Sequence, residues 1–273
     1  MEPGIYRGMS NQDYHADPAI GSTTVKSISI SPANLYLNPF KGNKSSHIGS
    51  AVHSALLEPY VFEGEYILRE DITSRASADF KALKASSDPE KIIIGSEVET
   101  VKKMIWSAGM NEDFVDYLSA PGESEISMFA VCPETGLQLK CRFDRISDNH
   151  PYPLDVKTCR DATERGFSQA FGRLHYHVQA AFYLYVLKLV TGRELNQFCF
   201  FALENTAPYK NCMYYIGEES LELGYKVMFE SLRKLKQCME DESLRNEGLV
   251  LPSNEINVPA YLLDDEYSDE VYL

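Results

Sequence analysis

Two stretches of partly alternating apolar and polar residues constrain the fold of this chain most strongly. They cover residues 125–131 and 137–146, and a Pro-Glu-Thr-Gly sequence separates them at residues 133–136. Alternation places successive side chains on opposite faces of a strand, and glycine can adopt the positive φ that a tight turn requires. The pattern therefore predicts a hairpin. A turn-rich link at 147–153 then leads to a third predicted strand at 154–159.

Helical segments surround these strands. Five segments carry helical periodicity or helix signals: 47–57, 76–84, 97–118, 168–190 and 219–238. Two further strands are predicted at 196–203 and 211–216, and Gly192 is a predicted helix stop. Turn-prone residues between 18 and 42 predict an irregular N-terminal segment. The order of elements predicts a mixed α/β fold with one central sheet flanked by helices.

The length of 273 residues predicts a single domain over 1–273. Its parts are a mainly helical N-terminal part (1–120), the sheet with its helix (121–217), and a C-terminal helix with an acidic tail (218–273). The last ten residues, DDEYSDEVYL, are expected to fray or to bind a partner.

Composition indicates an ordinary globular chain, with 44% hydrophobic and 24% charged residues. No apolar run reaches the roughly 18 residues of a membrane span, and the start, MEPGIYRGMSNQDYH, lacks the apolar core of a signal peptide. We therefore expect a soluble, cytoplasmic protein with no membrane partner. The six cysteines occur singly and without a C-x-x-C pair, which predicts free thiols rather than a zinc site or disulfides.

The net charge of −14 at first argues against a nucleic-acid partner. The charge is uneven, however: residues 140–193 contain nine Lys or Arg against five Asp or Glu, whereas residues 218–273 contain five against fourteen. Phosphate attraction depends on the local field, so DNA binding stays compatible with the composition. Two alternatives remain open, namely an acidic excess that only maintains solubility and an acidic protein that mimics DNA.

Three residues on the second and third predicted strands point to metal chemistry. Asp155 and Lys157 are two apart, so they face the same side of one strand, and Asp144 comes alongside if the preceding strand pairs antiparallel with it. Two carboxylates and a substrate phosphate suit Mg²⁺, which lowers the pKa of a bound water, and a neighbouring lysine can orient that water. Asp-x-Lys alone is common, and an exposed pair of opposite charges is the bland interpretation.

Other candidates are weak when taken singly. His53 shares a predicted helix face with Gly49, and a histidine on such a face is more often a core residue than a ligand. Glu125 begins a strand and is uninformative alone. Gln179 and Tyr183 are four apart on one helix face, where packing explains them equally well.

Taken together, in this order and spacing, these residues resemble the RecB-type nucleases of the PD-(D/E)XK superfamily. The likeness to the RecE-type exonucleases (exodeoxyribonuclease VIII) is closer and covers nearly the whole chain. It rests on these sequences: Gly4-Ile5-Tyr6, Ser10-Asn11-x-Asp13-Tyr14-His15, Gly49-x-x-x-His53, Leu57-Glu58-Pro59, Glu125, the Pro133-Glu134-Thr135-Gly136 turn, Cys141-Arg142-x-Asp144, Asp155-Val156-Lys157-Thr158 and Tyr176-His177-Val178-Gln179-x-x-x-Tyr183. The implied fold is the PD-(D/E)XK nuclease core.

The resemblance implies a metal site. Asp144 and Asp155 would be the principal ligands, with the Val156 carbonyl as a third. His53 would contact a second metal position, and Glu125 would support that position or a metal-bound water. The implied cation is Mg²⁺, with Mn²⁺ as an alternative.

The resemblance also implies roles in handling substrate. Lys157 would position or activate the attacking water. The candidates for substrate contact are Gln179, Tyr183, His177, Arg142 and Thr158. Some relatives hold an iron–sulphur cluster on one cysteine before the nuclease core and three after it. Here the first cysteine is Cys132 and only Cys238 follows the last predicted strand, so no cluster is expected.

The implied activity is hydrolysis of phosphodiester bonds by 5′→3′ resection of linear double-stranded DNA. The implied assembly is a homo-oligomeric ring that works with a single-strand annealing protein in phage-type recombination. A PD-(D/E)XK endonuclease or a single-strand-specific nuclease would have the same metal site and is the main alternative. An acidic DNA mimic is the remote one.

Overall fold

The computed structural model describes residues 1–38 and 47–256, so the expectation for the acidic tail at 264–273 lies outside the described residues. In chain order the elements are β1 (Gly4–Tyr6), α1 (Asn11–Ala16), α2 (Ser22–Ile30), α3 (Pro32–Leu37), α4 (His47–Leu57), α5 (Pro59–Glu65), β2 (Ile67–Arg69), α6 (Ala78–Ser86), the 3₁₀ helix η1 (Pro89–Lys91), β3 (Ile92–Ile94), α7 (Ser96–Gly109), α8 (Glu112–Ser119), β4 (Gly122–Val131), β5 (Gln138–Ser147), β6 (Pro153–Cys159), α9 (Glu164–Arg173), α10 (Tyr176–Thr191), β7 (Cys199–Glu204), β8 (Asn211–Tyr215), α11 (Glu218–Glu240) and the 3₁₀ helix η2 (Glu242–Asn246).

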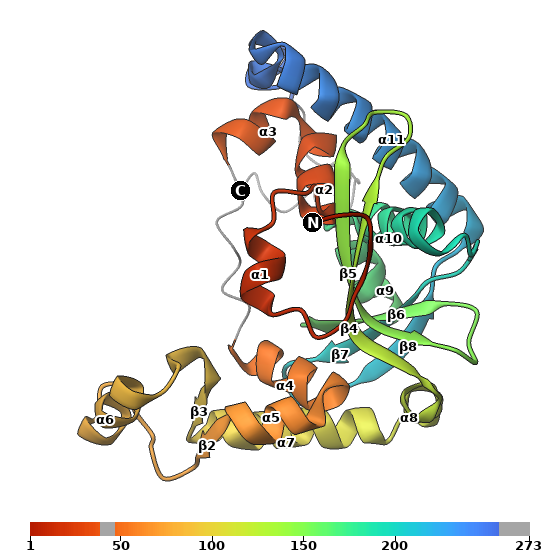
Figure 1. Cartoon of the computed structure of the whole chain (residues 1–273). Coiled ribbons are helices and arrows are strands. Elements are labelled where there is room, and N and C mark those ends of the chain that lie inside the picture. The colour runs from red at the N-terminus through yellow and green to blue at the C-terminus, as the bar shows by residue number, and fades with distance from the viewer. Residues whose placement is uncertain (39–46, 257–273) are drawn as a thin grey trace, which may run out of the picture.

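Six strands form one mixed sheet in the order β1-β4-β5-β6-β7-β8 (Figure 1). β4 and β5 form the predicted hairpin, paired antiparallel along nearly their whole length. β6 pairs antiparallel with β5 and parallel with β7, and β8 returns antiparallel to β7. The mixed sheet with helices around it confirms the predicted fold class.

Helices cover both faces of the sheet. On one face α10 packs against β4 and β5, and on the other α4, α7 and α8 pack against β6 and β7. β6 contributes to both faces because its side chains alternate. Val156 belongs to the core beneath α4, whereas Asp155 hydrogen-bonds to Gln179 on α10. The alternation therefore directs the candidate carboxylate toward α10.

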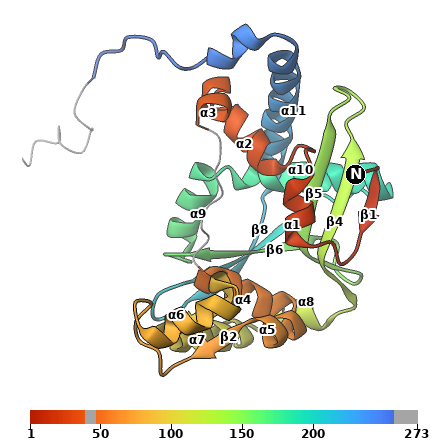
Figure 2. The same cartoon turned by 60° about the vertical axis from the view of Figure 1, so that its left-hand side comes forward.

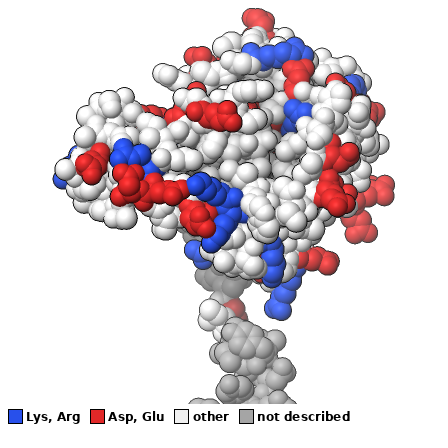
Figure 3. Space-filling model, turned by 90° about the horizontal axis from the view of Figure 1, so that it is seen from below, with Lys and Arg blue, Asp and Glu red and all other residues white. Residues whose placement is uncertain are grey.

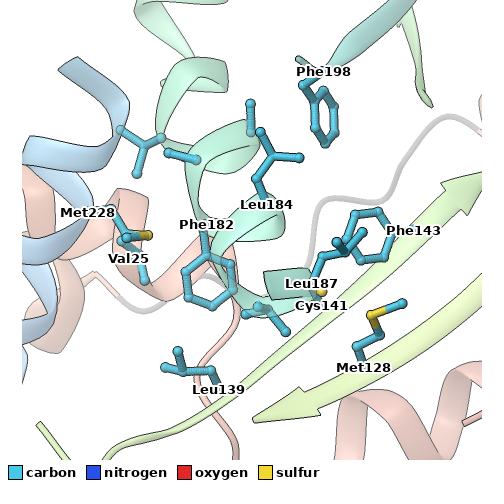
Figure 4. Packing of buried hydrophobic residues seen from close by; sticks show 14 of the residues in the cluster. Val25, Met128, Leu139, Cys141, Phe143, Phe182, Leu184, Leu187, Phe198 and Met228 are labelled. Atoms are coloured by element: carbon cyan, nitrogen blue, oxygen red, sulfur yellow. The ribbon is translucent and has the colours of Figure 1, made fainter. Parts of the chain in front are cut away.

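The larger core lies between the hairpin, α10 and α11 (Figure 4). Leu139 of β5 lies near Phe182 of α10, Phe143 packs against Tyr183, and Met228 of α11 lies on the other side of Phe182. α11 crosses α10 closely at Gly224, where an added Cβ would lie 2.3 Å from the His177 carbonyl oxygen. Only glycine permits that approach, and it fixes the N-terminal part of α10 against α11.

A small lobe projects from the body beside α5 and α7 (Figure 1). β2 and β3 pair in parallel there, and Phe80 of α6 packs with Ile72 and Ile92 in a separate small core. Seen from below, the lobe and the adjoining surface carry acidic and basic side chains intermixed (Figure 3).

Several sequence predictions are confirmed within a few residues. Helix α4 has the predicted bounds, β6 starts one residue earlier than predicted, and α11 extends the predicted helix at both ends. Gly192 ends α10 with a left-handed φ of 73°. All six cysteines are free, as expected for isolated cysteines. No helix among residues 1–38 and 47–256 is long and apolar enough to cross a membrane.

Two predicted helices are each broken in two. The segment 97–118 divides at Asn111, whose side chain accepts the Phe114 N–H and so caps α8. The segment 168–190 divides at His175, which adopts a left-handed φ of 53°, and Thr163 caps a start for α9 earlier than predicted. Helical periodicity in the sequence does not reveal either break, because the spacing of apolar residues continues across both of them.

Within residues 1–38 the N-terminal segment is not irregular, contrary to the prediction, whereas Pro39 and Gly42 lie outside the described residues. It contains α1, α2 and α3, with Ser10 capping α1 and Ser31-Pro32 starting α3. Of the residues assigned to turns, Gly21 is the N-cap of α2 and Pro32 is the first residue of α3, so the turn interpretation was wrong at these two positions.

Candidate active site

Asp144 and Asp155 lie beside a gap where β5 and β6 separate. The two strands pair at only two register positions. Beyond these, Asp144 Oδ2 accepts the Val156 N–H at 2.7 Å. A side-chain carboxylate thus takes the place of a backbone acceptor, and the strands stay apart. The antiparallel pairing that was needed to bring Asp144 alongside Asp155 is present.

His53 joins these strands from α4. Its Nε2 lies 2.8 Å from Asp144 Oδ2, and its Nδ1 lies 3.3 Å from Glu125 Oε1. Gly49 stands one helical turn earlier, and an added Cβ there would lie 3.2 Å from Thr158 Oγ1. Glycine therefore lets α4 approach β6 closely enough for His53 to reach the carboxylates. The Gly-x-x-x-His spacing has a physical reason.

Glu125 lies opposite Asp144 in the β4–β5 register, between the pairs Ser124↔Arg145 and Ile126↔Phe143. Its backbone has a φ of 51°, which is unusual for a residue other than glycine. Such a conformation costs on the order of 1–3 kcal/mol and is common at functional sites. The sequence pattern carries no signal of this strain.

Asp155 is held from two sides. It is 3% exposed. Gln179 Nε2 donates to Asp155 Oδ1 at 2.6 Å, and Lys157 Nζ lies 2.6 Å from Asp155 Oδ2. The amide of Gln179 is itself oriented by Lys26, whose Nζ donates to Gln179 Oε1 at 3.3 Å. Lys157 Nζ also lies 4.9 Å from the centre of the Tyr176 ring. Sequence reasoning missed Lys26, because it stands on α2 in a segment assigned as irregular.

Burial and mutual charge shift every pKa in this cluster. Burial opposes charge on His53, but Asp144 and Glu125 outweigh it and raise the pKa of His53 to about 9. Burial and then repulsion from Asp144 raise the pKa of Glu125 to about 7. Burial raises the pKa of Asp155 to about 6, although the Lys157 ammonium opposes the shift. Burial would raise the pKa of Asp144 too, but His53 outweighs it and lowers that pKa. The cluster holds more negative charge than its burial favours, so it attracts protons or a cation.

The cluster opens into a cleft of about 1170 Å³. Seven of the residues predicted to bind metal or substrate or to take part in catalysis line it: His53, Glu125, Arg142, Asp144, Val156, Lys157 and Thr158. The cleft walls are the loop before α1, helices α4 and α5, the 3₁₀ helix η1, and parts of β4, β5 and β6. Its opening gives a polymer access to the buried carboxylates.

Three other candidates lie behind or beside the cleft. Gln179 is buried and contacts Asp155, as described above. The ring of Tyr183 packs edge-on against Phe143 at 5.1 Å, within the core. His177 stacks on His175 with 5.7 Å between ring centroids. Direct contact of these three residues with DNA therefore stays a prediction. The contacts that they make within the protein support the site from behind.

Arg142 binds the N-terminal segment. Its guanidinium donates to the carbonyls of Met9 and Ser10 and to the side chain of Asn11, and it lies over the Tyr14 ring at 4.4 Å. It stands two residues before Asp144 on the same face of β5. Arg142 thus fixes one wall of the cleft, and a substrate contact would compete with these bonds.

The donor set suits a divalent cation. Ligand atoms of His53, Glu125 and Asp144 lie within 4.8 Å of one another. Asp155 Oδ2 is buried beside them and accepts no well-aligned hydrogen bond despite its ion pair with Lys157. Carboxylate oxygens with one imidazole fit Mg²⁺ or Mn²⁺ better than a soft metal. Taken singly, His53 and Glu125 carry weak sequence signals, yet the structure places both beside Asp144.

A mixed sheet whose separated strands carry an aspartate and an Asp-x-Lys sequence, with helices on both faces, defines the PD-(D/E)XK class. The chain belongs to the family described as a PDDEXK-like domain of unknown function (DUF3799), which matches residues 29–247.

Solved structures share the fold. A crystal structure from Eubacterium rectale, of a protein provisionally named an exonuclease, has a TM-score of 0.58 and 13% identity, and the match covers 93% of this chain and 97% of that chain. At this identity the likeness concerns the fold alone. The crystal structure of SSO0001 has 15% identity over 77% of this chain and 98% of that chain, and its TM-score of 0.31 is too low to support an argument. A search of curated proteins found no match.

Proposed function

We propose that this protein is a metal-dependent nuclease that hydrolyses phosphodiester bonds of DNA. The observation that carries the proposal is the cluster of His53, Glu125 and Asp144 next to the Asp155–Lys157 pair, at the floor of an open cleft. Membership of a PDDEXK-like family supports it, because Asp144 and the Asp155-x-Lys157 sequence fit the pattern that the family description names.

Asp144, Asp155, the Val156 carbonyl, His53 and Glu125 would hold the cation. When bound, Mg²⁺ or Mn²⁺ supplies positive charge opposite the phosphate and lowers the pKa of water. The remaining contributions to catalysis come from side chains of the protein.

Lys157 is the charged group best placed to orient the attacking water. Asp155 raises the pKa of Lys157 above its ordinary value although burial opposes this, so the lysine is an ammonium at neutral pH. An ammonium donates hydrogen bonds and stabilises negative charge that develops on the phosphate. Gln179 keeps Asp155 in place through its 2.6 Å bond.

The finer activity in this proposal is 5′→3′ exonucleolytic resection of linear double-stranded DNA in phage-type recombination. The resemblance of the sequence to the RecE-type exonucleases supports it, as does the provisional name of the Eubacterium rectale protein. A homo-oligomeric ring and a single-strand annealing partner belong to the same proposal.

The test is digestion of linear duplex DNA labelled at its 5′ or its 3′ ends, beside a closed circle of the same sequence, with Mg²⁺ or with chelator. We expect metal-dependent loss of the linear DNA alone, with the 5′ label released first, and no loss with Asp155→Ala. Cutting of the circle would show that the activity is that of an endonuclease rather than an exonuclease. Preference for a denatured substrate would indicate a single-strand-specific nuclease. A folded protein that cuts none of these DNAs would overturn the enzyme proposal and favour the acidic DNA mimic.

A further inference from the structure

Helix α9 has one aromatic face and one face of hydrogen-bond donors. Phe167 is buried and stacks on Tyr214 with 4.8 Å between ring centroids, and Phe171 meets Phe200 edge-on at 5.7 Å. The opposite face is exposed and carries Arg165, Ser168, Gln169, Gly172 and Arg173. Glu164 in the first turn is the one acidic residue of α9, and the sequence has none from Arg165 to Arg193, in a chain with 40 acidic residues.

The arginines of this region are free to bind a ligand. Many exposed cations elsewhere are in ion pairs, such as Arg7 with Glu123 and Arg233 with Glu134. Within residues 1–38 and 47–256, Arg160, Arg165 and Arg173 form no ion pair, and all three are exposed. Unpaired arginines cost little to bring to a phosphate, because no existing bond must break.

The acidic residues near α9 lie at its N-terminal end. Asp161 Oδ1 accepts from both the N–H and the hydroxyl of Thr163, so this carboxylate stabilises the turn before the helix. Hydrogen bonds from Thr163 lower the pKa of Asp161, and the nearby charges of Lys210 and Arg165 add to the effect. Lys210 therefore extends the basic surface across to the β7–β8 turn.

This surface comes near the active site at both ends of α9. Arg160 stands three residues after Lys157, just beyond the end of β6, and α9 lies beside that end of the strand (Figure 2). At the other end of α9, Arg173 is close to Tyr176. Burial raises the pKa of Tyr176, and the positive charges of Lys157 and Arg173 both oppose the shift. Tyr176 is thus near both Arg173 and Lys157, whose Nζ lies 4.9 Å from the ring centre.

We propose that Arg160, Arg165, Arg173 and Lys210 form a surface that binds the sugar-phosphate backbone of the DNA flanking the scissile bond. The identification of the bound polymer as DNA rests on the proposed function. Arg, Ser and Gln side chains are common donors to phosphate and carry no sequence preference, which suits an enzyme that moves along DNA. The surface also explains how a chain with a net charge of −14 binds a polyanion.

The test measures DNA binding in chelator, so that no cleavage occurs. The probe is a fluorescent 20-base-pair duplex, with one of its strands alone as a second probe, at several salt concentrations. The variant is Arg165→Ala/Arg173→Ala in the full chain. Its matched control is Arg193→Ala/Lys226→Ala, which removes two exposed, unpaired cations elsewhere. Arg193 lies beyond the far end of α10, a helix of 16 residues and therefore about 24 Å long.

We expect the α9 variant to bind the duplex roughly tenfold more weakly, with a slope of log K against log salt smaller by about 2, because two phosphate contacts are lost. Arg165→Lys/Arg173→Lys should restore the slope, and the control should behave as wild type. Equal binding by the α9 variant and the control would overturn the proposal, as would a wild type that binds no duplex, or a loss confined to the single strand.

The two proposals fail differently. If the wild type binds DNA through α9 but cuts no DNA in Mg²⁺, the proposed DNA-binding surface stands and the proposed nuclease activity is refuted. If the wild type cuts DNA but the α9 variant binds DNA as well as the control does, the proposed nuclease activity stands and the proposed DNA-binding surface is refuted. Thermal unfolding by circular dichroism verifies that each variant is folded.

Discussion

Replacement of Gly224 by alanine tests the packing that holds α10 behind the active site. The added Cβ would lie 2.3 Å from the His177 carbonyl oxygen and 2.8 Å from its carbon. The two helices must separate by roughly 1 Å to reach ordinary van der Waals distance. Overpacking of this kind costs about 1–3 kcal/mol, and the better helix propensity of alanine returns up to about 1 kcal/mol. We expect a net loss of about 1–2 kcal/mol.

Gly172→Ala is the matched control, because this glycine is also helical and no atom lies within 4 Å of an added Cβ. It should leave stability unchanged or raise it by up to about 1 kcal/mol. Urea unfolding followed by circular dichroism gives both values, and the Gly224→Ala melting temperature should fall by roughly 2–4 °C. Because His177 is two residues before Gln179, cleavage should slow as well. Equal stability of the two variants would refute the close crossing of α10 and α11.

Three further predictions concern the site itself. Gln179→Leu removes the 2.6 Å bond to Asp155, and kcat on linear duplex DNA should fall about 10–100-fold while the protein stays folded; an unchanged kcat would mean that Asp155 needs no such support. The pKa of His53 is raised to about 9, so a cation must displace its proton; calorimetric Mn²⁺ affinity should increase from pH 6 to pH 9, and a flat profile would exclude His53 as a ligand. The pKa of Glu125 is raised to about 7 in the folded protein, so the folded state binds more protons than the unfolded state from about pH 4.5 to 7. The free energy of unfolding without metal should therefore decrease as pH rises through that window. Glu125→Gln should reduce the decrease, and an equal pH dependence in both proteins would contradict the assignment.

The sheet and the central motif were readable in the sequence because both depend on local patterns. Alternation around the 133–136 turn predicts the hairpin, and the two-residue spacing of Asp155 and Lys157 puts them on one face. Their pairing with Asp144 required only an antiparallel neighbour, which β5 provides.

The rest of the site depends on contacts between distant segments. Lys26 and Gln179 are 153 residues apart, and no local pattern relates them. The left-handed backbone of Glu125 and the break at His175 likewise follow from tertiary packing rather than from residue type. Arg142 shows the opposite case: it resembled a substrate contact in sequence, and in the structure it binds the segment around Met9 and Ser10.

The most direct test of the central claim is the rate at which linear duplex DNA is cleaved by the wild type, by Asp144→Asn and by Lys226→Met, each in Mg²⁺ and in chelator. Asp144 bonds to both His53 and the Val156 N–H, whereas Lys226 is exposed on α11. The account predicts cleavage only in Mg²⁺, at equal rates for the wild type and Lys226→Met, and at least about 1000-fold slower for a folded Asp144→Asn. Cleavage that persists in chelator, or in Asp144→Asn, would contradict it.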